Sequence, residues 1–192
     1  MITRYHSLLA HTLAGTNCSA DDGSPFRRTG ESVFRMAFAY ESDGASFLSR
    51  GDPVNALAAF LYGLGWLHCG IAAGLLTYHD GQPGCPFGSP CERIPAPHHQ
   101  KLDEKTRRYA HLLTTALTSI SPAPEAGTPI HAFALQVRFI AELYLLRGNN
   151  LTLAGNPEDG LVSFSYGHGW IDAGVQTGLF SISAHREIFT VD

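Results

Sequence analysis

The stretch GDPVNALAAFLYGLGWLHCGIAAGLL at residues 51–76 returns 104 positions later as GNPEDGLVSFSYGHGWIDAGVQTGLF at residues 155–180. Extended toward the N-terminus, the same ungapped register pairs residues 4–76 with 108–180 and gives 22 identities in 73 positions. The identities include tryptophan, glycine and proline at fixed offsets, so chance similarity between two apolar helices does not account for them. The chain of 192 residues is therefore a tandem duplication of one structural unit.

Three helices are predicted in each copy. The first has apolar residues at spacings of three and four (Tyr5, Leu8, Leu9 and Leu13). The second and third start at Ser24-Pro25 and Asp52-Pro53, because a polar N-cap followed by proline at the first helical position is typical of a helix start. The second copy repeats both starts as Thr128-Pro129 and Asn156-Pro157. The third helix should run to about Leu76 in the first copy and to about Phe180 in the second.

The expected fold is all-α, because no alternating segment is long enough to form a sheet. Two similar three-helix units, residues 1–79 and 101–192, are joined by a linker at 80–100 that is rich in glycine and proline. We expect the units to pack as one pseudo-two-fold helical bundle. By this interpretation single-copy relatives would pair as homodimers, and this chain would be the fused version.

Small residues follow one stripe of each third helix, which we predict to be the seam between the two copies (Gly63, Gly70 and Gly74; Gly167, Gly174 and Gly178). Each glycine inside a helix costs about 1 kcal/mol relative to alanine. Such a cost is tolerated where another backbone lies close against the stripe. The alternative is that the stripe leaves room for a bound ligand.

Composition and charge argue against several classes of partner. The chain has 13 Lys and Arg against 17 Asp and Glu, evenly divided between its halves, so we expect no nucleic acid. The N-terminal segment has too short an apolar run for a signal peptide, so a cytoplasmic protein with reduced thiols is expected. Residues 54–76 lack charged side chains, but the equivalent helix carries Glu158 and Asp172 on a polar face. Two copies of one fold should share a solvent, so we expect no membrane span.

Aromatic pairs one helical turn apart lie beside the small-residue stripe: Tyr62 with Trp66, and Tyr166 with Trp170. Core packing explains them most simply. The alternative is a ligand pocket between the copies, whose candidate lining residues are these four aromatic residues together with Asp43, His68, His168 and Asp172. His168 and Asp172 are also spaced for an ordinary contact within one helix.

At these residues the sequence resembles the archaeal domain of unknown function family 357. That family's pattern has a Tyr-x-x-Asp, a Gly-Asp turn, and then a helix in which a Gly-Trp block precedes an aspartate and spaced glycines. The first copy matches with Tyr40, Asp43, Gly51-Asp52 and Gly65-Trp66; the second matches with Tyr144, Gly155, Gly169-Trp170 and Asp172. The resemblance implies a helical bundle in an archaeal cytoplasm and supplies no activity.

Each copy departs from the family at one of its two aspartate positions. The first copy has Asp43 but His68, and the second has Arg147 but Asp172. We expect Asp43–His68 and Arg147–Asp172 to be ion pairs that replace an acid pair, each contributing about 0.2–1 kcal/mol if partly exposed. A weak metal site at such positions is the alternative.

Other chemistry finds little support. Cys85 and Cys91 lie near three histidines, but their spacing is wider than that of paired zinc ligands, so zinc, a disulfide and ordinary loop residues all stay open. Gly63-Leu64-Gly65 lies inside a helix rather than after a strand, so it is not a nucleotide-binding loop. No catalytic motif appears, and we expect neither a cofactor nor a metal. The expected role is that of a non-enzymatic structural or adaptor protein, acting through an unknown protein partner or self-association; the alternative is a small-molecule-binding protein or enzyme.

Overall fold

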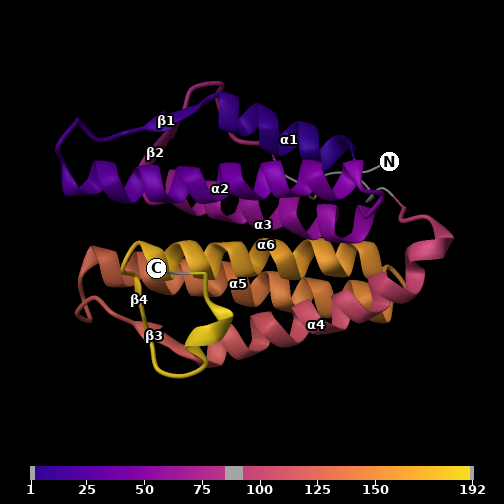
Figure 1. The fold of residues 1–192 in the computed structure, drawn as a ribbon. Coiled ribbons are helices and arrows are strands. Elements are labelled where there is room, and N and C mark those ends of the chain that lie inside the picture. Colours follow the sequence, from indigo (N-terminus) through magenta and orange to yellow (C-terminus); the bar gives the residue numbers. More distant parts are fainter. Residues whose placement is uncertain (1–2, 85–92, 191–192) are drawn as a thin grey trace.

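The computed structural model describes residues 3–84 and 93–190. The first copy contains α1 (Thr3–Ala14), β1 (Thr16–Cys18), α2 (Pro25–Ser49), α3 (Pro53–Ala72) and β2 (Leu76–Tyr78). After the short helix η1 (Ala96–His98), the second copy contains α4 (His99–Thr118), β3 (Ile120–Pro122), α5 (Pro129–Leu153), α6 (Pro157–Gln176) and β4 (Phe180–Ile182), followed by η2 (Arg186–Ile188). The predicted all-α fold of two three-helix units is confirmed (Figure 1).

The predicted helix starts depend on side-chain caps in three of four cases. The Ser24 hydroxyl accepts from the backbone N–H of Phe26, and the Thr128 hydroxyl accepts from that of His131. The Asp52 carboxylate accepts from the N–H of Asn55, whereas Asn156 makes no capping hydrogen bond. These caps satisfy N–H groups that have no partner within the first helical turn.

The third helices end earlier than predicted, at Ala72 and Gln176. Gly74 and Gly178 follow these ends with φ of 71° and 78°. In the first copy, the N–H of Leu75 donates to the carbonyl of Gly70, and that of Gly74 donates to the carbonyl of Ile71, the bonding pattern of a Schellman motif. Both glycines are exposed, so their inclusion in the seam was wrong: their role is to terminate a helix.

Short strands, which the sequence did not predict, follow the first and third helices of each copy. β1 pairs antiparallel with β2, and β3 pairs antiparallel with β4. Each strand has three residues. The two pairs tie the end of the first helix to the end of the third in each copy.

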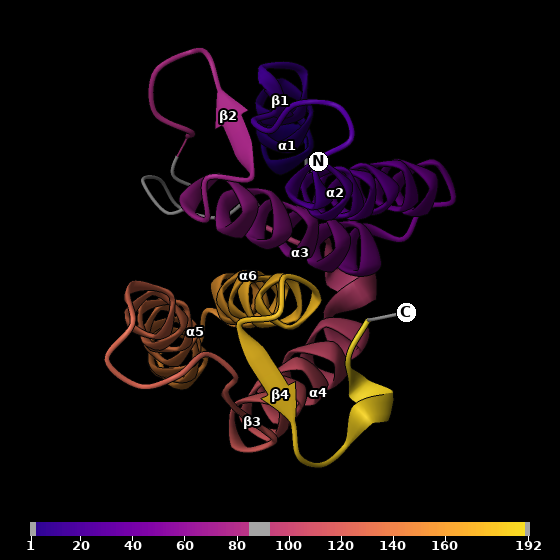
Figure 2. The same ribbon diagram turned by 90° about the vertical axis from the view of Figure 1, so that its left-hand side faces the viewer.

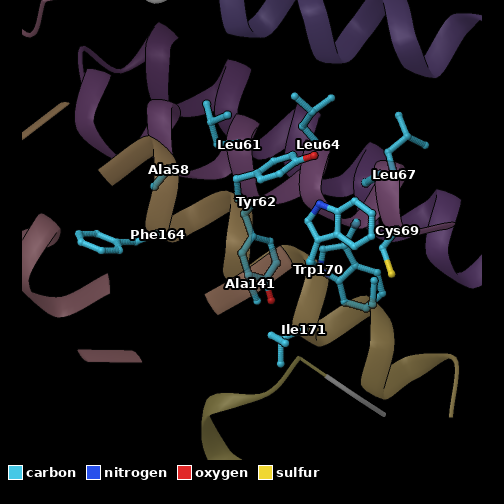
Figure 3. Packing of buried hydrophobic residues seen from close by; sticks show 14 of the residues in the cluster. Ala58, Leu61, Tyr62, Leu64, Leu67, Cys69, Ala141, Phe164, Trp170 and Ile171 are labelled. Carbon is cyan, nitrogen blue, oxygen red and sulfur yellow. The ribbon is translucent and has the colours of Figure 1, made fainter. Parts of the chain in front are cut away.

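α3 and α6 lie at the centre of the molecule (Figures 1 and 2). Seen along the bundle in Figure 2, α1 and α2 cover α3 on one side, and α4 and α5 flank α6 on the other. The core is continuous between the copies, with Trp66, Phe60 and Phe164 among its largest buried side chains. Figure 3 shows Tyr62 and Trp170 packed with leucines of α3 in this core. The predicted central contact between the third helices is therefore present, and the core belongs to both copies.

The close approach of α3 and α6 occurs at Gly65 and Gly169, which the predicted seam left out. A Cβ atom on Gly65 would overlap the carbonyl oxygen of Tyr166, and one on Gly169 would overlap that of Tyr62. A Cβ on Gly65 would also lie 3.0 Å from the Cα of Gly169. Because only hydrogen fits between these backbones, this crossing requires glycine on both helices.

The predicted seam glycines Gly63, Gly70, Gly167 and Gly174 pack inside their own copies instead. A Cβ on Gly63 would lie 3.1 Å from the carbonyl oxygen of Ala37 on α2, and one on Gly70 would lie 2.7 Å from Val33. Gly167 and Gly174 face Leu113 and Phe180 in the same way. The prediction was wrong because each third helix is packed on opposite sides: this stripe faces the other elements of its own copy, and the other side faces the partner copy.

Two helices are long and apolar enough to cross a membrane by length and composition, α3 and α5. The most apolar window of α3 is 89% buried in the protein, whereas that of α5 is only 17% buried. α3 is thus the core helix, and its burial accounts for the lack of charged side chains in this segment. The linker cysteines Cys85 and Cys91 lie outside the described residues.

Candidate functional site

Two side-chain contacts cross between the copies beside the glycine crossing. The Tyr62 hydroxyl donates to the Asp172 carboxylate, and the Tyr166 hydroxyl lies 2.8 Å from Nδ1 of His68. Tyr166 is the equivalent of Tyr62 in the second copy, and His68 is the equivalent of Asp172 in the first copy. Both are thus the same pseudo-symmetric contact, with a carboxylate at one end and an imidazole at the other.

Burial controls the ionisation of both contacts. Burial, followed by the negative charge of Asp172, raises the pKa of Tyr62 well above its usual value, so this phenol stays protonated and donates. Burial lowers the pKa of His68 from 6.5 to about 4, so its ring is neutral near pH 7. The Asp172 carboxylate is fully buried and also accepts from the backbone N–H of Thr190 at 3.0 Å. These hydrogen bonds compensate a buried charge that would otherwise be costly.

The expected ion pairs Asp43–His68 and Arg147–Asp172 do not form. His68 contacts Tyr166, and the ionic partner of Asp172 is His168, with Nε2 and Oδ1 3.7 Å apart. Arg147 donates to the Ser163 hydroxyl at 2.6 Å. Asp172 lies nine residues further along α6 than Ser163, about 13 Å at 1.5 Å per residue, so Arg147 contacts the wrong turn of that helix for such a pair.

A cavity of about 390 Å³ lies between the copies on the side where the C-terminal segment ends; we call it the inter-copy cavity. It is lined by residues of α2, α3, α4, α6 and the C-terminal segment: Tyr40, Asp43, Phe47, Asn55, Ala59, Tyr62, Lys105, Tyr109, Leu112, His168, Ile188 and Thr190. Elements of both copies thus form its walls, as expected for a pocket between repeats.

Of the eight candidate pocket residues, three line this cavity: Asp43, Tyr62 and His168. Asp172 lies next to two of them, as a partner of both Tyr62 and His168. The other four are not in its lining: Trp66 and Trp170 are buried in the core, and His68 and Tyr166 contact each other.

Sequence reasoning missed the remaining polar wall, in particular Lys105, Asn55 and Tyr109. Tyr109 is the equivalent of Tyr5, which the sequence marked only as an apolar position of the first helix. Lys105 lies three residues before the second copy's match begins at residue 108, so the repeat gives no guidance there. Its position on an amphipathic helix beside Tyr109, one turn away, was the available indication.

Among residues 3–84 and 93–190, no group of three or more His, Cys, Asp or Glu side chains is arranged to hold a metal ion. The weak metal site considered at the aspartate positions would need Asp43 and His68 together, and these side chains have separate surroundings.

A second surface feature lies on α5. Its apolar side chains Leu135, Phe139, Leu143, Leu146 and Leu153, which we call the α5 stripe, are exposed; Phe139 and Leu146, for example, are 57% and 58% exposed. At 100° per residue the stripe lies opposite the buried face of the helix, which holds Ala134, Val137, Ala141 and Gly148. In Figure 2 no other helix covers this outer side of α5.

The comparisons identify the repeat. The family model described as "Protein of unknown function (DUF357)" matches twice, at residues 4–76 and 108–180. No curated protein and no solved structure matches the chain. The two matches coincide with the two copies of the internal register and together cover more than half of the chain. This protein therefore belongs to the DUF357 family, of which it carries two copies in tandem.

Proposed function

We propose that this protein acts without chemistry of its own, as a structural or adaptor protein that assembles through the α5 stripe. The supporting observation is a difference between the copies. At the positions equivalent to the stripe, α2 carries Glu31, Arg35, Ala39, Ser42 and Ser49. The fold therefore does not require apolar residues on the outer face of the second helix. We infer that the second copy has them because this face binds a partner.

The size of the stripe favours a macromolecular partner. From Leu135 to Leu153 it extends about 27 Å at 1.5 Å per residue. Soluble monomers rarely expose a continuous apolar surface of this kind unless it binds something. Burying a leucine or phenylalanine side chain contributes about 1.5–3 kcal/mol, so several together are enough to hold a partner.

The partner we propose is a second copy of this chain, with the two α5 helices antiparallel. A two-fold interface requires a surface that complements itself. The α5 stripe complements itself when two α5 helices run antiparallel and cross near residue 141. Leu135 of one chain then lies opposite Leu146 of the other, and Phe139 lies opposite Leu143. Arg138 and Glu142 form an ion pair at 2.9 Å within one helix and lie along the same side of the stripe. In the dimer, Arg138 of each chain would lie near Glu142 of the other chain.

A variant that copies α2 onto α5 tests this proposal. Leu135→Glu, Phe139→Arg, Leu143→Ala and Leu146→Ser together give α5 the outer face that α2 already carries on the same scaffold, with no change in net charge. Light scattering coupled to size exclusion, and sedimentation velocity, should show a wild-type dimer. The fourfold variant should be a folded monomer, with its dimer Kd raised roughly a hundredfold or more.

Phe38→Glu is the matched control, because Phe38 is also exposed and Glu142 is its equivalent in the second copy. This control should dimerise like the wild type. A wild type that stays monomeric at high micromolar concentration contradicts the proposal, as does a dimer that survives the four substitutions. Flotation of the wild-type monomer with anionic vesicles, lost in the fourfold variant, would instead indicate that the stripe lies on a membrane surface.

A further inference from the structure

The inter-copy cavity is lined by two side chains of opposite charge, Asp43 and Lys105. Asp43 on α2 and Lys105 on α4 line it, and neither forms an ion pair or hydrogen bond with the described residues. Burial, followed by repulsion from Arg108 and Lys101, lowers the pKa of Lys105, and the weaker attraction of Asp52 and Glu104 does not offset this effect. Asp43 is exposed and Lys105 is partly buried, so water solvates both groups in the free protein. A ligand that fills the cavity and displaces this water must supply a partner for each charge.

The remaining walls suit the cationic end of such a ligand. Tyr40, Tyr62 and Tyr109 bring three aromatic rings to the cavity, and Tyr40 and Tyr62 pack with ring centroids 4.4 Å apart. Burial raises the pKa of all three phenols, so they remain neutral. Neutral aromatic faces next to a carboxylate favour an ammonium group.

Two buried polar atoms without a hydrogen-bond partner lie in the cavity wall at His168 and directly behind it at Asp172. His168 lines the cavity although it is only 4% exposed, and its Nε2 has no hydrogen-bond partner. The Oδ1 atom of Asp172, 3.7 Å away, is also buried without one. Buried polar atoms normally find partners, so unfilled ones beside a cavity indicate a place where a ligand or water completes the bonding.

The second copy carries different residues at the corresponding positions. Its equivalents of Asp43 and Ala59 are Arg147 and Ser163, which hydrogen-bond to each other at 2.6 Å. Its equivalent of His168 is Leu64, which is apolar and buried. The fold therefore accommodates a hydrogen-bonded Arg–Ser pair and an apolar side chain at these positions, so it does not require the polar lining at Asp43 and His168.

We propose that the inter-copy cavity binds a small zwitterion of the amino-acid type, its ammonium group at Asp43 among the tyrosine rings and its carboxylate at Lys105. This site is independent of the α5 stripe, which lies on the outer side of another helix. Binding here is recognition without a chemical step.

The experiment uses the whole protein and a panel of defined probes. Thermal unfolding and isothermal titration are measured with each of the standard amino acids and with glycine betaine, at millimolar concentration. Putrescine and propionate serve as probes that carry only one kind of charge. We expect at least one zwitterion to raise Tm by several degrees and to bind stoichiometrically, and the single-charge probes to have little effect.

The double variant Asp43→Arg with Ala59→Ser tests the location, because it builds the pair found at Arg147 and Ser163 and should fold for that reason. It should lose the binding, and Lys105→Met should weaken it at least tenfold. Asp103→Asn on the exposed side of α4 is the charge control and should bind as the wild type does. If no zwitterion shifts Tm, or if the shift persists in the double variant, the proposal is wrong.

Discussion

At the scale of single residues, the α3–α6 crossing shows what a repeat reveals and what it hides. The register of the two copies correctly matched Tyr62 with Tyr166 and His68 with Asp172. It did not show which residues are in contact. The repeat identifies positions that correspond between the copies, but corresponding residues do not have to touch each other. We expected pairs within one copy, and the hydrogen bonds join a tyrosine of each copy to the acid or imidazole of the other.

The buried imidazole of His68 should make the protein sensitive to acid. Its pKa falls from 6.5 to about 4 on folding, so the unfolded chain takes up this proton more readily than the native one. Stability contributed by neutral His68 is complete above about pH 6.5 and is lost as pH falls toward 4. Full loss amounts to about 3 kcal/mol, at 1.36 kcal/mol per pKa unit.

Chemical denaturation between pH 7 and pH 4 measures this loss, and His68→Asn provides the comparison. Asparagine can still form a hydrogen bond with the Tyr166 hydroxyl, as donor or acceptor, but does not titrate. Its unfolding free energy should depend less on pH across this window than that of the wild type. Equal slopes for the two proteins would mean that His68 is not responsible for the acid sensitivity.

At the scale of elements, sequence patterns predicted helix starts better than helix partners. Proline after a polar cap located the starts of α2, α3, α5 and α6 correctly, because capping is a local interaction. The small-residue stripe indicated close packing correctly but was assigned to the wrong neighbour. Both sides of α3 are buried, and periodicity does not distinguish a side that faces α2 from one that faces α6. The cavity was predicted only in part for a related reason: α4 and the C-terminal segment approach it through tertiary packing.

The difference between a glycine that faces α6 and one that faces α2 gives a prediction for the helix crossing. Gly65→Ala should destabilise the protein by about 2 kcal/mol or more, because the new methyl group would overlap the backbone of α6 at the Tyr166 carbonyl. Gly63→Ala should be nearly neutral, since its closest contacts, at 3.0–3.1 Å, need to move only slightly and alanine gains about 1 kcal/mol of helix propensity. Urea denaturation of the two variants compares them directly. A larger loss for Gly63→Ala than for Gly65→Ala would contradict the assignment of the tighter backbone contact to the α3–α6 crossing.

At the scale of the whole molecule, the two copies share one core and so should unfold as one unit. Contacts between the copies are distributed along the bundle: Lys101 pairs with Asp52 at 2.6 Å near the start of α3, and Gln176 bonds to Ser32 at 3.1 Å near the end of α6. Neither copy can lose its third helix without exposing the centre of the other. A duplicated sequence therefore does not imply two independent folding domains here.

The two tryptophans allow this cooperativity to be measured, because each copy has one and both are buried in the shared core. Trp66→Phe leaves a fluorophore only in the second copy, and Trp170→Phe leaves one only in the first. In each variant the thermal transition followed by fluorescence should coincide with that followed by far-UV circular dichroism, which reports the helices of both copies. Independent copies would instead give a fluorescence transition at one temperature and a dichroism curve with two steps. The shared α3–α6 core predicts a single step in both.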